Sequence, residues 1–135
     1  METARLSKRV GAYIINLILY LGIGFGSAIP FLTLLKLHVI FYVLISLGIA
    51  IITSFIFDAL IMAGSKGYNL GTAIMGVKYV ASDGKRLSGK QIVIRSSSES
   101  ILIFAILDLF YFIKNRTERG VIDRLSSSFA IDTRI

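Results

Sequence analysis

Four polar side chains recur along one face of the first apolar segment of the chain. Arg9, Tyr13, Asn16 and Tyr20 are spaced at i, i+4, i+7 and i+11, which places them on one side of an α-helix. An arginine at the mouth of a membrane helix can reach the headgroup layer, but a deeper amide needs a partner from protein or water. Two chemistries meet that need. The amide could hydrogen-bond a neighbouring helix, or this face could line a polar cleft for an ion or small solute.

Three aspartates could act with these side chains. Asp58 lies near the end of the second apolar segment, where water is within reach. Asp108 lies inside a third apolar segment, where an ionised carboxylate is costly, so it must be protonated, ion-paired or turned toward an aqueous recess. Arg9 and Arg95 are possible counter-charges for it. Asp123, within "RGVIDRL", is expected on a surface turn, in salt bridges with the neighbouring arginines.

The chain lacks the common patterns of enzymes and metal sites. It has no cysteine and one histidine, which excludes disulfides, thiolate catalysis and cysteine-ligated zinc. It has no Ser-His-Asp arrangement, no HExxH and no phosphate-binding loop motif. The sequence therefore predicts a protein that is not an enzyme, with no cofactor and no metal.

The composition indicates a membrane protein. Of the 135 residues, 55% are hydrophobic and 17% are charged, which is more apolar surface than a soluble domain of this size can cover. Fifteen Lys and Arg against eight Asp and Glu give a net charge of +7. The basic residues flank the apolar segments, without the basic-aromatic pattern of a nucleic-acid groove. We expect a multi-pass protein of the cell membrane that binds no nucleic acid.

The apolar segments predict a mainly α membrane fold. The first, about 10–29, is expected to end or kink at Pro30, and the second covers about 39–63. Each is long enough to cross a hydrocarbon core of about 30 Å, so together they form a transmembrane hairpin. A third segment, about 99–113, is short for a span. It could cross fully, but a re-entrant or tilted segment is preferred because it keeps both basic flanks on one side.

The polar segments are expected to lie in the cytoplasm with the N-terminus, because they carry most of the basic residues. The loop 64–98 is expected to hold a short interfacial helix in "NLGTAIMG" and a small β-hairpin, "VKYVASDGKRLSGKQIVIR", that turns at Asp83–Gly84. The basic tail, 114–135, contains a possible strand, "SFAIDT", that could pair with "VKYVA". The whole chain, 1–135, is expected to form one domain.

Small residues in the first two segments predict close helix packing. Gly22 and Gly26 form a GxxxG pattern, with Gly24 between them, and Ser46, Ala50 and Thr53 follow one stripe of the second segment. Such residues let helix backbones approach closely, either inside the hairpin or between copies of the chain.

These parts, in this order, resemble the RDD family of small prokaryotic membrane proteins. That family has an arginine opening the first helix and an aspartate within it, at the positions of Arg9 and Asn16 in "RVGAYIIN". Its "TLGK" stretch after the hairpin corresponds to "NLGTAIMGVKYVASDG", and a later arginine corresponds to Arg95. Its terminal element corresponds to "RGVIDRLSSSFAI", with Arg119 and Asp123 in place. The resemblance covers nearly the whole chain.

The chain departs from the family pattern at four positions. Asn16 stands for the aspartate of the first helix, Asn69 for a threonine and Thr72 for a lysine. Ser128 stands where a threonine is usual. An asparagine keeps a hydrogen-bonding group but has no titratable proton. If family members move ions by protonating that aspartate, this chain has lost the step or has moved it to Asp58 or Asp108.

Two functions remain open. The resemblance implies transport of an ion or small solute, including cation/proton exchange. Because two spans cannot enclose a pathway, this function requires a homo-oligomer. The candidate lining residues are Arg9, Tyr13, Asn16, Asp58, Arg95 and Asp108. The alternative is an accessory or scaffold protein whose basic cytoplasmic face binds a membrane protein partner or anionic lipid headgroups.

Overall fold

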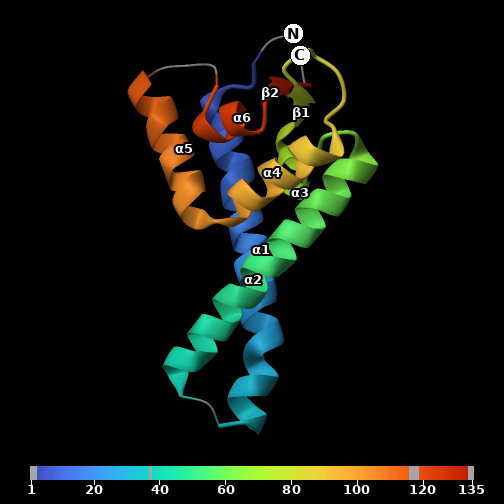
Figure 1. The fold of residues 1–135 in the computed structure, drawn as a ribbon. Helices are drawn as coiled ribbons and strands as arrows, with labels where there is room; N and C mark the ends of the chain where they lie inside the picture. Colours follow the sequence, from blue (N-terminus) through green and yellow to red (C-terminus); the bar gives the residue numbers. More distant parts are fainter. Residues whose placement is uncertain (1–2, 37, 116–118, 134–135) are drawn as a thin grey trace.

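Two long helices form a hairpin that extends away from the rest of the molecule (Figure 1). They are α1 (Leu6–Leu34) and α2 (Val39–Ser65), and both are long and apolar enough to cross a membrane. The predicted apolar segments are therefore confirmed as helices. Pro30 lies inside α1 and does not end it. In an apolar segment, a helix that lacks one backbone hydrogen bond is still favoured over a non-helical backbone, because the latter would leave many amides and carbonyls without partners. The computed structural model describes residues 3–36, 38–115 and 119–133.

Small side chains form the contact between α1 and α2. The buried face of α1 includes Gly24 and Ala28, and that of α2 includes Ser46, Ala50 and Ser54. A Cβ on Gly24 would lie 2.4 Å from the backbone oxygen of Ser46, so the backbones meet there. Thr53 of the predicted stripe is not part of this buried face.

Two glycines of α1 that lie two residues apart in sequence provide a matched test of this packing. Gly24→Ala is expected to destabilise the fold by about 1–3 kcal/mol, the usual cost of overpacking a tight contact. Gly26→Ala is expected to be neutral or to stabilise slightly, since a Cβ there meets no described atom within 4 Å and alanine is favoured in helices by about 1 kcal/mol. Equilibrium unfolding in mixed detergent micelles would measure both. Equal effects of the two changes would show that the hairpin does not pack through Gly24.

A group of short elements, which we call the cap, gathers at the end of the hairpin that carries the termini (Figure 1). Its apolar centre includes Val77, Tyr79, Ile92 and Ala130, together with Met62 from the last turns of α2. The cap is therefore built directly onto the hairpin. Its elements are α3 (Leu70–Met75), β1 (Val77–Ala81), α4 (Gly89–Ser100), α6 (Val121–Leu125) and β2 (Ser128–Asp132).

The two strands of the cap pair with each other in an antiparallel ladder, with Tyr79 opposite Ala130. This confirms the predicted pairing of "VKYVA" with "SFAIDT". The segment before α1 continues the arrangement, because Thr3 forms a bridge with Ile131 and the Ala4 amide donates to the Ala130 carbonyl at 2.9 Å. The start and the end of the chain are thereby held together. Residues 116–118 and 134–135 of the predicted tail lie outside the described residues.

The predicted β-hairpin is wrong in its second strand. The chain does turn at Asp83–Gly84, where Gly84 has a φ of +79°, but the following segment begins α4 instead of returning as a strand. The reason is a capping box. The Ser88 hydroxyl accepts a hydrogen bond from the backbone N–H of Gln91 at 3.3 Å. The Gln91 side-chain oxygen accepts one from the backbone N–H of Ser88 at 2.9 Å. These bonds satisfy amides that a strand would have presented to a partner strand.

The third apolar segment is a helix, α5 (Leu102–Asn115), which meets α4 at a bend of 94°. Both outer ends of this bent pair lie toward the end of the molecule that carries the termini (Figure 1). The short helix predicted in "NLGTAIMG" is confirmed as α3.

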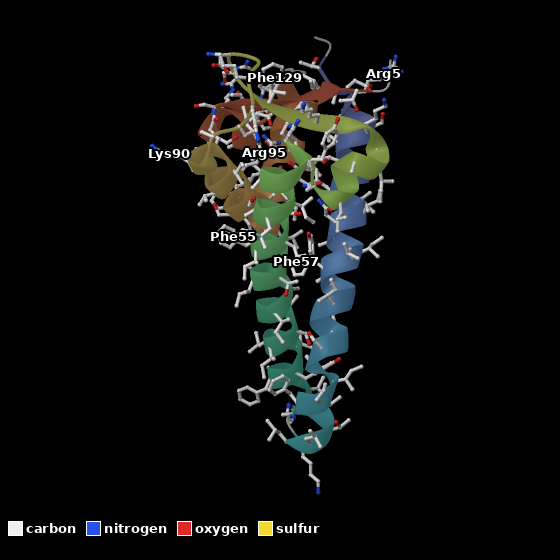
Figure 2. The ribbon with its side chains drawn as sticks, turned by 90° about the vertical axis from the view of Figure 1, so that its right-hand side faces the viewer. Arg5, Phe55, Phe57, Lys90, Arg95 and Phe129 are labelled. Atoms are coloured by element: carbon white, nitrogen blue, oxygen red, sulfur yellow. The ribbon has the colours of Figure 1, made fainter. Side chains whose placement is uncertain are left out.

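Large apolar side chains cover the outside of α1, α2 and α5. Figure 2 shows such side chains along the hairpin of α1 and α2. Ile18, Leu60 and Ile103 are 67%, 66% and 68% exposed, and in α2 only 17% of the most apolar stretch is buried. A soluble monomer rarely exposes so continuous an apolar surface, because contact with water is unfavourable. The exposure matches helices that are surrounded by lipid.

Candidate functional site

Two arginines and one carboxylate form the centre of the polar interior. One oxygen of the Asp123 carboxylate, Oδ2, lies 2.7 Å from Arg9 Nη2. The other, Oδ1, lies 2.8 Å from Arg95 Nη1. All three side chains are at most 3% exposed. Arg9 comes from α1, Arg95 from α4 and Asp123 from α6, so one carboxylate joins three elements. Asp123 was predicted on a surface turn, and this is corrected: the two arginines compensate its charge and allow it to be buried.

Asp108 of α5 also faces this centre. Its Oδ1 accepts a hydrogen bond from the Ile122 amide at 2.9 Å, and its Oδ2 accepts one from the Tyr13 hydroxyl at 3.1 Å. Arg9 Nη2 lies 3.9 Å from Oδ2. Asp108 is therefore turned inward and has partners, as its position in an apolar helix requires. Of the two possible counter-charges, Arg9 is the one that the structure places beside it.

Glu99 completes the group, which we call the charge cluster: Arg9, Arg95, Glu99, Asp108 and Asp123. The Glu99 side chain is 3% exposed and lies one helical turn after Arg95, with Oε1 at 2.9 Å from Arg95 Nε. Its Oε2 accepts a hydrogen bond from the side-chain nitrogen of Asn69, Nδ2, at 3.2 Å. Figure 2 shows Arg95 enclosed by the cap at the end of the hairpin.

Aromatic rings cover the two guanidinium groups. The Arg9 guanidinium carbon lies 4.3 Å from the ring centroid of Phe112, and that of Arg95 lies 3.4 Å from the ring centroid of Tyr79. These contacts exclude water while preserving an electrostatic attraction to each cation. Arg95 also donates to the Ser128 hydroxyl at 2.7 Å, which connects α4 to β2.

The arginines hold Asp123 in its ionised form. Burial is the largest single influence and acts to raise the pKa of the Asp123 carboxyl, but the attractions and hydrogen bonds of Arg95 and Arg9 together outweigh it and lower that pKa below its ordinary value. For a carboxyl whose pKa is lowered by folding, the contribution to stability is complete above the unfolded-state pKa. It is lost as the pH falls through the folded-state pKa.

Asn16 connects α1 to α3. Its Oδ1 accepts a hydrogen bond at 2.8 Å from the amide of Gly71, in the first turn of α3. A Cβ on Gly71 would lie 2.2 Å from the Ala12 carbonyl oxygen, so glycine is required for this approach. Within α3 the Asn69 side chain accepts from the Thr72 amide at 2.9 Å. Of the two chemistries open for Asn16, the structure shows the hydrogen bond to a neighbouring element.

Asp58 lies apart from the charge cluster, between α1 and α2. It is 1% exposed, and its Oδ1 accepts from the Tyr20 hydroxyl at 2.8 Å. One turn earlier on α2, Ser54 shares a hydrogen bond of 3.0 Å with Ser100 of α4. No Lys or Arg of the described residues forms an ion pair with Asp58. Among the described residues, Asp58 is therefore a buried carboxyl without a cationic partner.

The structure brings together most of the predicted site residues. Arg9, Tyr13, Arg95, Asp108 and Asp123 lie in or against the charge cluster, whereas Asn16 and Asp58 occupy separate positions. Arg119 lies outside the cluster, with its guanidinium over the Phe129 ring and near the Ser82 hydroxyl.

Sequence reasoning missed several contributors to the interior, among them Glu99, Tyr79 and Phe112. Glu99 could have been found from its i+4 spacing to Arg95, which is typical of helical ion pairs. Tyr79 gave no such signal, because an aromatic residue in a strand is common. Within the described residues no group of three or more His, Cys, Asp and Glu side chains could hold a metal ion.

Comparison with known proteins gives one family. The RDD family model matches residues 3–127, which include every residue of the charge cluster. Searches of curated proteins and of solved structures gave no match.

Proposed function

Because this chain belongs to the RDD family, we propose that it is a multi-pass cell-membrane protein that exchanges protons for monovalent cations. One observation carries the proposal: in the described interior, four buried carboxyl groups face only two buried arginines. The carboxyl groups are those of Asp58, Glu99, Asp108 and Asp123, and the arginines are Arg9 and Arg95.

The two arginines can neutralise two of these carboxylates. The other two negative charges would be very costly in a low-dielectric interior unless each binds a proton or a small cation. Asp58 is the best candidate for exchange, since no described basic residue pairs with it and it lies in a helix long enough to span the membrane. Glu99 is less suited to exchange, because Arg95 Nε lies 2.9 Å from its Oε1.

The proposed cycle uses a single carboxyl for both ions. A proton leaves Asp58 toward one side of the membrane, and the resulting carboxylate attracts a monovalent cation. The Tyr20 hydroxyl, 2.8 Å away, donates to the carboxylate while it is charged. That cation comes from the side that received the proton and leaves toward the other side, where a new proton binds Asp58, so one proton and one cation cross the membrane in opposite directions. Because Asn16 has no titratable proton, we assign the exchange step to Asp58.

The arrangement in the membrane follows from the charge distribution. We propose that the cap and the N-terminus lie in the cytoplasm, because Lys66, Lys85 and Arg86 are at that end of the hairpin. The α4–α5 pair would then enter the membrane from the cytoplasm and return to it. A homo-oligomer would complete the pathway, since two spans are too few to enclose one.

Proteoliposomes test the proposal. With a pH-sensitive dye trapped inside and an imposed Na⁺ or K⁺ gradient, wild-type protein is expected to move protons faster than empty liposomes. Asp58→Asn, which keeps an acceptor for Tyr20 but cannot release a proton, is expected to lower the rate to that of empty liposomes. Asp83→Asn removes one carboxylate from the exposed turn and is expected to retain the wild-type rate.

Each variant must show the same helix content by circular dichroism and the same elution volume as wild-type protein. Wild-type liposomes no faster than empty ones would refute exchange. An active Asp58→Asn variant would refute the assignment of the site.

The inward packing of the polar residues favours an accessory role as the second candidate. Arg9, Tyr13 and Asn16 all bond to other parts of the same chain, so they can act purely as structural links. The basic end of the molecule would then bind a membrane protein partner. A stoichiometric partner that copurifies in mild detergent, and that is lost with Lys85→Glu/Arg86→Glu, together with inactive liposomes, would select this function.

A further inference from the structure

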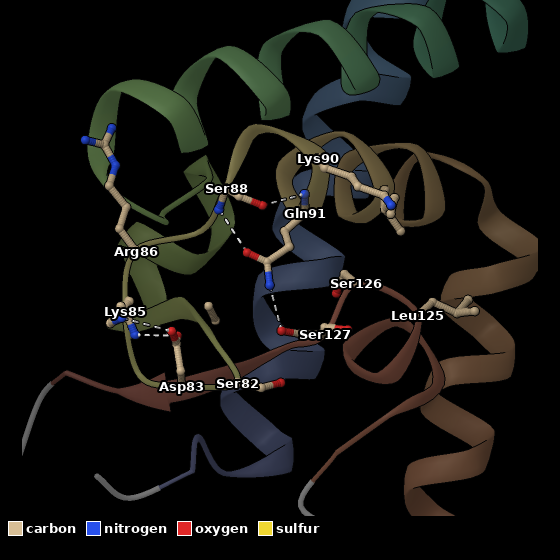
Figure 3. Close-up of a pocket in the computed structure, with 12 residues that line it drawn as sticks. Ser82, Asp83, Lys85, Arg86, Ser88, Lys90, Gln91, Leu125, Ser126 and Ser127 are labelled. Atoms are coloured by element: carbon tan, nitrogen blue, oxygen red, sulfur yellow. Dashed lines mark hydrogen bonds and ion pairs between the residues drawn. The ribbon is translucent and has the colours of Figure 1, made fainter.

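A pocket of about 610 Å³ opens on the cap, between the turn after β1 and the turn after α6 (Figure 3). One wall is formed by the turn from Ser82 to Ser88 and the first turn of α4, and the other by Leu125 to Ser127. Gln91 crosses between them, because its side-chain nitrogen donates to the Ser127 carbonyl at 2.9 Å. This bond links the two walls of the pocket.

The lining of the pocket is basic and rich in hydrogen-bond donors. Lys85, Arg86 and Lys90 contribute three positive charges against the single carboxylate of Asp83. Lys85 lies 3.6 Å from Asp83, but both side chains are mostly exposed, so this ion pair is weak and can be exchanged for a stronger anion. Serine hydroxyls on both walls add neutral donors. Such a set suits a compact multivalent anion.

The position of the pocket relates it to the membrane surface. Arg86 donates to the carbonyl of Ala63, near the end of α2, so one rim of the pocket touches the end of a possible membrane span. Figure 2 shows Lys90 projecting outward near the same end of the hairpin. Leu125, on the opposite wall, is 53% exposed and offers an apolar contact beside the charges.

We propose that this pocket binds a phosphate ester, either the headgroup of an anionic lipid or a soluble phosphate compound. Lys85 and Lys90 supply the charges that are free to turn toward the ligand. Arg86 holds the rim of the pocket against α2. The site is independent of proton exchange at Asp58, since none of its lining residues belongs to α1 or α2.

Isothermal titration calorimetry on the purified full chain in detergent tests this site. The probes are dioctanoyl phosphatidic acid, glycerol 3-phosphate and, as a zwitterionic comparison, dioctanoyl phosphatidylcholine. Wild-type protein is expected to bind one of the first two saturably and phosphatidylcholine much more weakly. Lys85→Gln/Lys90→Gln is expected to weaken binding about 25-fold, since each basic residue near an anionic group contributes about fivefold.

A matched variant separates a defined site from general attraction. Arg5→Gln/Lys66→Gln removes the same charge from exposed positions of the same end, outside the pocket, and is expected to bind within about twofold of wild type. Binding of phosphatidic acid alone identifies a lipid ligand, and equal binding of glycerol 3-phosphate identifies a soluble one. Equal weakening in both double variants, or saturable binding of neither phosphate probe, would overturn the proposal.

Discussion

Asp123→Asn is expected to destabilise the fold by about 3–5 kcal/mol, the usual cost of removing one partner from a buried ion pair. Asparagine has nearly the same shape and can still accept the 3.3 Å bond from the Gly120 amide, so the packing changes little. What it removes is the negative charge between Arg9 and Arg95. The two buried guanidinium groups would then lose the carboxylate that they share, with Glu99 left beside Arg95 and Asp108 left 3.9 Å from Arg9.

Equilibrium unfolding in mixed micelles, followed by circular dichroism, measures this change. Asp83→Asn removes a carboxylate from an exposed turn and serves as the control, with an expected change within about 0.5 kcal/mol. The expected loss for Asp123→Asn should diminish as the pH is lowered, because the wild-type carboxyl then becomes protonated as well. A loss similar to that of the control at neutral pH would mean that Asp123 does not hold the cap to α1.

Arg95→Lys, although it keeps the positive charge, is expected to destabilise the fold by about 2–4 kcal/mol. The planar guanidinium of Arg95 reaches Asp123, Glu99 and Ser128 at 2.7–2.9 Å while stacking on the Tyr79 ring. The charge of a lysine ammonium is concentrated on one nitrogen, whereas a guanidinium presents three. One nitrogen cannot lie within hydrogen-bond distance of all three partners. At least one buried acceptor would lose its donor.

Arg5→Lys is the matched change, since Arg5 is exposed and just precedes α1. It is expected to leave the free energy of unfolding unchanged within about 0.5 kcal/mol. Comparable stability of the Arg95→Lys and wild-type proteins would show that charge alone, without the fork geometry, is sufficient at this position.

The two long apolar helices were predictable because a lipid bilayer requires a length and a composition that can be counted in a sequence. The partner of β1 was also predictable, since an alternating strand at the end of the chain needs a neighbour. The second strand of the hairpin was not. An alternating pattern around Ile92 favoured a strand, but the Ser88–Gln91 capping box favoured a helix, and the local cap prevailed.

The site was predictable in its residue types and less so in its geometry. The aligned face of α1 correctly singled out Arg9, Tyr13 and Asn16, because a polar side chain in an apolar helix must find a partner. Their partners come from α3, α5 and α6, which are distant in sequence, so no spacing rule could identify them. Asp123 was misplaced for the same reason: its nearest arginines in sequence are not the ones it binds.

The pairing of Arg9 with Asp123 also sets an order of events during synthesis. Arg9 leaves the ribosome early, at the start of α1, while its carboxylate is added only after α5 has been made. Until then Arg9 lacks the carboxylate that it pairs with at 2.7 Å, and β1 lacks its partner strand. A chain interrupted before α6 would therefore lack both the ion pair that joins α1 to α6 and the strand pairing that completes the cap.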